Sequence, residues 1–357
     1  MASVVQTPLC LPIALWPESD RASWELNCTP GDPFDDPHYG ATLRADSLDK
    51  ARKGYGRWLS FLVANGWLDP NQPAAQRVTR PRLRAYLRGL KAAGNADYTI
   101  IGRITELTMA LKIIAPGEDV SWIRRPDGVT IYARLPKVTR PIVVPDAGVL
   151  FAWGLKMMES AEAAGGATTH LFAYRDGLLI AILASRGRRL RSMTRLRVGR
   201  ELLEGGRCYR VELKPEQVKT NRHDRFDLPE CLTTYVRHYL EVVRPRLLAG
   251  RAEDALWINP RGGAMTAKAI QHRIRKLSLL RFEVAFGPHR FRYAIATTAA
   301  LRDPGHPGLA AGVLGGSAEV IEQHYNRAGQ SQAAQKHAAM LKQRRRRLSS
   351  LVGDRRQ

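Results

Sequence analysis

A proline-rich stretch divides this chain and limits the folds that are open to it. Pro126, Pro136, Pro141 and Pro145 all fall within residues 126–145. Proline removes a backbone N–H donor and favours turns and extended backbone. We therefore interpret residues 126–145 as a linker between two folded regions. The length of 357 residues is sufficient for two domains of ordinary size.

The region before the linker has the pattern of a small helical domain. Apolar residues recur at helical spacing across 48–65. Helix-start signals follow at Thr79, where Pro81 suits the first turn, and at Asp97. These segments predict three or four short helices, which form a compact basic module over residues 44–125.

The first 43 residues differ from the rest of the chain in charge. Residues 1–43 contain one basic and six acidic side chains, a net charge of −5. They are also rich in proline and turn-forming residues, as in Pro30-Gly31-Asp32-Pro33. We expect residues 1–43 to form an acidic N-terminal arm with little regular structure.

The region after the linker combines helices with a few strands. Helical patterns run from Pro145 to about Leu183 and return from Pro229 onward. Between them the period changes, and we expect three short strands joined by turns, at 196–198, 208–213 and 225–227. The predicted fold is therefore mainly α: a small all-α domain, then a larger α+β domain at 146–345 with a small antiparallel sheet, and a basic tail at 346–357.

The charge balance indicates a polyanionic partner. The chain has 56 Lys and Arg residues against 33 Asp and Glu, a net charge of +23. Nucleic acid is the first partner to consider for so basic a chain. An RNA-coating protein would have a similar balance, and so would a protein bound to an anionic membrane. No basic amphipathic helix with an apolar face stands out to favour the membrane.

Several patterns set further expectations about location and metals. The longest apolar run, Gly177 to Ala184, is too short to cross a bilayer. The N-terminus lacks the pattern of a signal peptide, so we expect a cytoplasmic protein. The four cysteines form no CxxC pair and no cluster with zinc spacing, so we expect no metal site.

Four short segments contain residues suited to phosphate chemistry. His289 and Arg292 lie three residues apart, on one face of a predicted helix, where they could contact a phosphate. Tyr325 stands in a polar, basic setting and could serve as a nucleophile. The arginine-rich segment 185–191 and the turn at Lys219-Thr220 complete the set. Each segment alone also fits an ordinary solvated surface.

Taken in order, the four segments resemble the catalytic domain of the tyrosine recombinase (phage integrase) family. Gly187-Arg188-Arg189, with Leu196 seven residues further on, is similar to the family's first arginine motif and selects Arg189. The other matches are Lys219-Thr220 to the hairpin lysine, His289 and Arg292 to H-x-x-R, and Tyr325, nine residues after Gly316, to the nucleophile. The resemblance covers about 44–345, and residues 44–125 are similar to the family's SAM-like core-binding domain.

The resemblance implies a recombinase, with the integrase of a mobile element as its particular role. Tyr325 would attack a DNA phosphodiester and form a 3′-phosphotyrosyl bond, without metal, cofactor or ATP. Arg189 and Arg292 would clamp the phosphate, Lys219 would be the general acid and His289 the base. The partners it implies are double-stranded DNA and three further copies of the chain, in a homotetramer on two duplexes.

One position departs from the family's pattern. The family has His, or sometimes Trp, at the third place of its L-G-H motif, where this chain has Gly316. Glycine offers no side-chain donor. His324 is a candidate substitute. Two alternatives stay open. One is a DNA-binding protein of this fold with weakened or lost cleavage, for which Gly316 is the sequence argument. The other is a type IB topoisomerase, which shares the chemistry but relaxes DNA.

Overall fold

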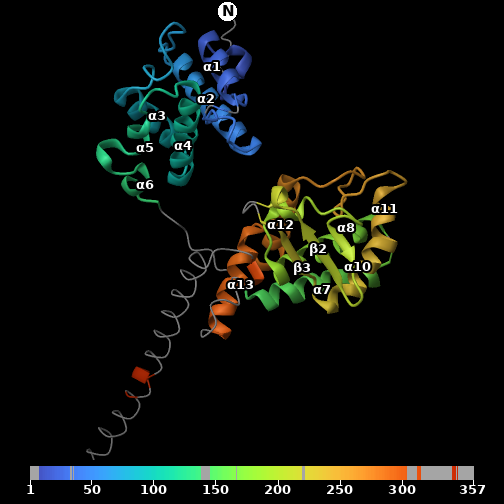
Figure 1. Ribbon diagram of the computed structural model, residues 1–357. Helices are drawn as coiled ribbons and strands as arrows, with labels where there is room; N and C mark the ends of the chain where they lie inside the picture. The colour runs from blue at the N-terminus through green and yellow to red at the C-terminus, as the bar shows by residue number, and fades with distance from the viewer. Residues whose placement is uncertain are drawn as a thin grey trace, which may run out of the picture. The chain divides into compact units, whose positions relative to one another are not determined.

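The computed structural model describes residues 8–32, 34, 36–137, 145–165, 167–218, 222–303, 312–314, 340–342 and 344. The chain divides into two compact units, residues 1–140 and residues 141–357 (Figure 1). Each unit has its own hydrophobic core. No helix in the described part of the chain is long and apolar enough to cross a membrane.

The first unit is helical. Its helices are α1 (Glu18–Cys28), α2 (Ala45–Ala64), α3 (Arg80–Ala92), α4 (Asp97–Ile114), α5 (Ser121–Arg124) and α6 (Ile131–Arg134). Helix α2 buries Tyr55, Trp58 and Leu62 on one face. It packs against α4, which is apolar along much of its length. The helices expected from the patterns at 48–65, Thr79 and Asp97 are therefore present as α2, α3 and α4.

The prediction of an irregular N-terminal arm is wrong for the segment that contains α1. Trp16 and Trp24 are buried in the core of the first unit. The ring of Trp16 packs edge-on against both Trp24, at 5.5 Å between centroids, and Tyr55, at 4.9 Å. The turn-rich composition does not reveal this helix, because the residues that pack on α1, such as Trp16 and those of α4, are not its neighbours in the helical pattern.

A buried ion pair also ties α1 to the first unit. The Asp20 carboxylate lies 2.5 Å from Nη1 of Arg77, and both side chains are buried. The Tyr55 hydroxyl donates to the same carboxylate at 2.7 Å. At least one acid of the presumed arm is therefore part of the core and does not face solvent.

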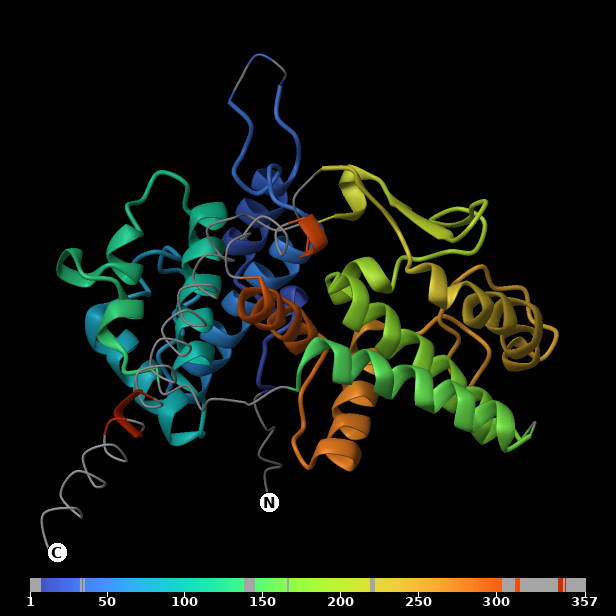
Figure 2. The ribbon, with the colours of Figure 1, turned by 90° about the horizontal axis from the view of Figure 1, so that it is seen from below.

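The second unit is built around a helical hairpin. Helices α7 (Ala147–Ala163) and α8 (Thr168–Arg186) lie side by side (Figure 2). Gly154 and Gly177 make this approach close: a Cβ at either position would lie 2.7 Å from the other's carbonyl oxygen. The described residues of this unit also form α9 (Leu190–Met193), α10 (Thr233–His238), the π-helical turn Tyr239–Val243, α11 (Arg244–Leu248), α12 (Ala267–Phe282) and α13 (His289–Arg302).

The second unit also contains the small antiparallel sheet that the sequence predicts. Its strands are β1 (Leu202–Glu204), β2 (Tyr209–Leu213) and β3 (Asp224–Asp227), in the order β1-β2-β3. Val211 of β2 faces Leu202 of β1 and Phe226 of β3 in the register. Alternate residues of β2 are buried, so one face of the sheet packs on the core.

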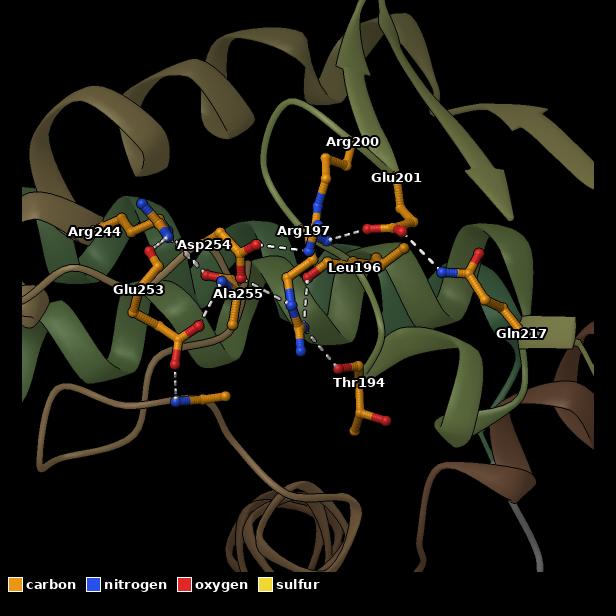
Figure 3. A network of polar contacts seen from close by, with 11 residues as sticks. Thr194, Leu196, Arg197, Arg200, Glu201, Gln217, Arg244, Glu253, Asp254 and Ala255 are labelled. Carbon is orange, nitrogen blue, oxygen red and sulfur yellow. Dashed lines mark hydrogen bonds and ion pairs between the residues drawn. The ribbon is translucent and has the colours of Figure 1, made fainter. Parts of the chain in front are cut away.

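The first predicted strand, 196–198, is not a strand of this sheet. The Val198 N–H donates to the Asp254 carbonyl, and the Leu256 N–H to the Leu196 carbonyl, both at 2.9 Å. Arg197 reinforces this bridge by pairing with the Asp254 carboxylate at 2.9 Å (Figure 3). The segment is extended as expected, but it pairs mainly with residues more than fifty positions away in the sequence. It makes one isolated bridge to β1, between Val198 and Leu202, and the sheet itself begins at β1.

Candidate active site

The first wall of the candidate site is the beginning of α13. Pro288 precedes this helix, whose first residue is His289. Phe291 and Ala294 are buried in the core, which turns the opposite face, with His289 and Arg292, outward. The His289 ring packs edge-on against Tyr293, with 5.1 Å between centroids. The two residues expected from the H-x-x-R spacing therefore share a face.

The second wall is the corner between α8 and α9. Gly187 ends α8 in the left-handed conformation, with φ +51°, and its N–H donates to the Leu183 carbonyl. A Cβ at Gly187 would lie 2.5 Å from Cδ2 of Leu314. Glycine thus suits this position for two reasons: it adopts a positive φ readily, and it leaves room for the Leu314 side chain. Arg189 follows as the N-cap of α9 and is half-buried.

Arg292 connects these walls and a third segment. Its Nη1 donates to the Gly187 carbonyl at 2.5 Å and to the Leu314 carbonyl at 3.0 Å. Two of the four segments selected from the sequence, the first arginine motif and H-x-x-R, therefore meet at this guanidinium, together with Leu314.

A basic pocket of about 360 Å³ opens between the walls. Its lining residues are Arg188, Arg189, Leu190, Gln271, Gly287, Pro288, His289 and Arg292. None of these described lining residues is acidic. Burial, followed by the positive charges of Arg189 and Arg188, lowers the pKa of Arg292 to about 10, and Asp224 opposes this shift. A bound anion would relieve the repulsion, so the pocket is suited to a phosphate.

The remaining predicted site residues lie outside the described part of the chain. These are Lys219, Gly316, His324 and Tyr325. The flanks of the Lys219 turn are described. Gln217, just before it, donates to Glu201 at 2.8 Å, and Glu201 in turn accepts from the Arg197 N–H (Figure 3). Asp224, just after it, begins β3.

Sequence reasoning missed two residues of this pocket. Arg188 is buried and paired with Asp224, whereas the sequence marked it only as a basic neighbour of Arg189. Gln271 reaches the pocket from α12, and no local pattern distinguishes it from other exposed polar residues of that helix.

A larger cavity of about 1180 Å³ lies beside β2 and β3, but its chemistry is different. Both acidic and basic side chains line it, and several are paired, such as Arg225 with Glu212 at 3.0 Å. Paired charges hold an anion less strongly than an uncompensated cluster does. The smaller basic pocket is therefore the better candidate for phosphate chemistry.

The comparisons with known proteins identify the fold. No family model and no curated protein sequence matches the chain. Among solved structures, the XerH site-specific recombinase bound to palindromic difH substrate is similar, with a TM-score of 0.57 and 14% identity over 93% of this chain and 99% of that one. The Tn1549 transposon integrase in complex with transposon right end DNA has a TM-score of 0.51 and 15% identity over 82% and 95%. The chain therefore has the fold of the tyrosine recombinases, and the predicted mainly-α fold class is confirmed.

Proposed function

We propose that this chain is a site-specific DNA recombinase, which cuts and rejoins DNA through a 3′-phosphotyrosyl bond to Tyr325. One observation carries the proposal: Arg189, His289 and Arg292, from segments about a hundred residues apart, line one basic pocket without an acidic lining residue among those described. Shared fold supports it, because XerH is described as a site-specific recombinase bound to its DNA substrate. The Tn1549 relative, an integrase bound to transposon end DNA, favours a mobile-element role.

The proposed first step is a transesterification. The Tyr325 oxygen attacks phosphorus, the new O–P bond forms, and the bond from phosphorus to the 5′-oxygen breaks. His289 accepts the phenol proton, and Lys219 donates a proton to the departing 5′-oxygen. Resealing is the reverse reaction, with a 5′-hydroxyl as nucleophile. The phosphodiester energy stays in the protein–DNA bond, so the reaction needs no ATP.

The two arginines stabilise the charge that develops during this step. A guanidinium offers a planar set of donors that matches two phosphate oxygens. Each donor of this kind typically contributes about two to three powers of ten in rate. Arg292 is held in place by two backbone carbonyls, so its orientation is set before the DNA binds.

The proposed partners follow from the charge and the fold. A net charge of +23 favours a nucleic acid as partner, and the fold shared with DNA-bound recombinases favours double-stranded DNA. Exchange between two duplexes requires several active sites at one junction, so we propose a homotetramer on two duplexes. We propose that such a protein acts in the cytoplasm.

Covalent capture tests the proposal without knowledge of the target sequence. The full chain is incubated with a pool of nicked duplexes whose central sequence is randomised, and DNA that survives denaturation on the protein is recovered. We expect wild-type protein to retain DNA covalently. Tyr325→Phe should bind the pool with nearly unchanged affinity and retain none, because only one hydroxyl is lost. Covalent retention by Tyr325→Phe would show that another residue is the nucleophile.

The same assay separates the two alternatives. A DNA-binding protein that has lost cleavage, for which Gly316 is the sequence argument, would bind the pool and retain no DNA in either form. A type IB topoisomerase would retain DNA and relax a supercoiled plasmid, but it would not exchange strands between two recovered duplexes.

A further inference from the structure

Arg188 is a buried arginine with two partners on one strand. Its side chain is 6% exposed. Nη2 lies 3.0 Å from Oδ1 of Asp224, and Cζ lies 4.3 Å from the centre of the Phe226 ring. Both partners belong to β3. One guanidinium therefore ties the corner between α8 and α9 to the start of β3.

The backbone at Arg188 joins two parts of the pocket. On one side is Gly187, whose carbonyl accepts from Arg292. On the other side is Arg189, the N-cap of α9 and a lining residue. A displacement of Arg188 would therefore move the Arg189 side chain and the carbonyl that orients Arg292.

The pair also limits the positive charge of the pocket. Arg188, Arg189 and Arg292 all line it, and Asp224 is paired with the first of them. A carboxylate beside Arg188 neutralises that guanidinium and leaves the charges of Arg189 and Arg292 for a bound anion.

We infer that Arg188 is a positioning residue of the reaction: through its pair with Asp224 it holds Arg189 and the Gly187 carbonyl in place, and it does not itself bind the phosphate. This inference rests on the proposed recombinase function. The competing interpretation is that Arg188 contacts the phosphate directly, since its Nε is buried and has no hydrogen-bond partner among the described residues.

A double-mutant cycle distinguishes the two roles. The variants are Arg188→Met, Asp224→Asn and the double variant, and the measurement is single-turnover formation of the covalent complex on a captured duplex. Misplacement of a catalytic group by about 1 Å can cost about a hundredfold in rate. We expect each single variant to be slower by about ten- to a hundredfold, with the duplex dissociation constant changed less than about threefold because Arg188 is buried.

The double variant decides between the interpretations. If the two residues act as a pair, the double variant is about as slow as either single variant, because the second change removes nothing further. The inference would be overturned if the rate reductions of the two single variants multiplied in the double variant. It would also be overturned if Arg188→Met slowed cleavage and Asp224→Asn did not. Either result would favour direct phosphate contact by Arg188. The double variant also buries no unpaired charge, so it is expected to fold if a single variant does not.

Two further variants separate positioning from simple destabilisation. Arg188→Lys keeps a charge that Asp224 can pair, and we expect cleavage at least tenfold faster than in Arg188→Met. Arg175→Met is the matched control: Arg175 is buried, lies 2.6 Å from Asp176 and stacks on Phe172, but it does not line the pocket. It should lower the melting temperature and leave the cleavage rate of the folded protein within about twofold. Equal slowing by Arg175→Met would overturn the inference.

The outcome for wild-type protein keeps the two proposals apart. Wild-type protein that forms no covalent complex would overturn the recombinase function, and with it this role for Arg188. If wild-type protein cleaves but the rate reductions multiply in the double-mutant cycle, only the role proposed for Arg188 is overturned, and the recombinase function stands.

Discussion

Arg292 donates a hydrogen bond of 2.5 Å to the carbonyl of Gly187, a residue that precedes it by 105 positions. The same nitrogen also donates to the Leu314 carbonyl at 3.0 Å. A guanidinium has five N–H donors, so these bonds leave others for a phosphate. The residue that is expected to clamp the substrate therefore also holds together the turns around it.

Because Arg292 is expected to bind both the two carbonyls and the phosphate, we predict that lysine cannot replace it. Lys carries the charge but lacks the planar arrangement of donors that serves two carbonyls and a phosphate together. We expect Arg292→Lys to slow covalent-complex formation by about two to three powers of ten. Single-turnover cleavage of a captured duplex measures it. Arg290→Met is the control, because Arg290 lies two residues from Arg292 but does not line the pocket. An Arg292→Lys variant with more than about a tenth of the wild-type cleavage rate would contradict the prediction.

Gly187 is expected to tolerate no side chain. Its φ of +51° is strained for other residues, and a Cβ would lie 2.5 Å from Leu314 and 2.7 Å from Ile295. We expect Gly187→Ala to lower the free energy of unfolding of the second unit by about 2 kcal/mol or more and to slow cleavage. Gly199→Ala is the control for backbone strain alone, since Gly199 has a φ of +77° and nothing within 4 Å of a Cβ. Equal denaturation midpoints for the two variants would show that the packing is adaptable.

Lys219 is expected to be the general acid that protonates the departing 5′-oxygen. Lys219→Ala should slow cleavage of ordinary DNA by about two to four powers of ten. A substrate with sulfur in place of the 5′-bridging oxygen should restore most of the rate, because a thiolate leaves without a proton. The rate ratio of the two substrates, measured for Lys219→Ala and for Arg292→Lys, is the test. Equal ratios in both variants would remove Lys219 from this role.

The buried pair of Asp20 and Arg77 is expected to be important for the stability of the first unit. Asp20→Asn leaves the Arg77 guanidinium, which is 0% exposed, without a counter-charge. Such a loss typically costs about 3–5 kcal/mol. Urea unfolding followed by tryptophan fluorescence reports it, because Trp16 and Trp24 lie in the same core. Asp49→Asn is the control: its partners are exposed, so it should change the free energy of unfolding by less than about 0.5 kcal/mol. Similar losses of stability in the Asp20→Asn and Asp49→Asn variants would mean that the buried pair adds little.

Patterns that depend on near neighbours were predictable from the sequence. Helical periodicity is a property of residues three and four apart, so α2, α3 and α4 could be recognised from their own residues. The spacing of His289 and Arg292 on one helix face is local in the same sense.

Only the tertiary structure decided which distant segments are partners. By composition Trp16 and Trp24 belong to a turn-rich arm, but in the structure the Trp16 ring packs against both Trp24 and Tyr55. The residues of the extended segment at 196–198 likewise do not reveal that it pairs with 254–256. Arg188 and Arg189 are adjacent arginines, yet Arg188 is buried against Asp224 of β3, whereas Arg189 is half-buried and lines the pocket. The physical reason is common to all three cases: burial and charge pairing depend on groups that are distant in sequence, whereas backbone periodicity does not.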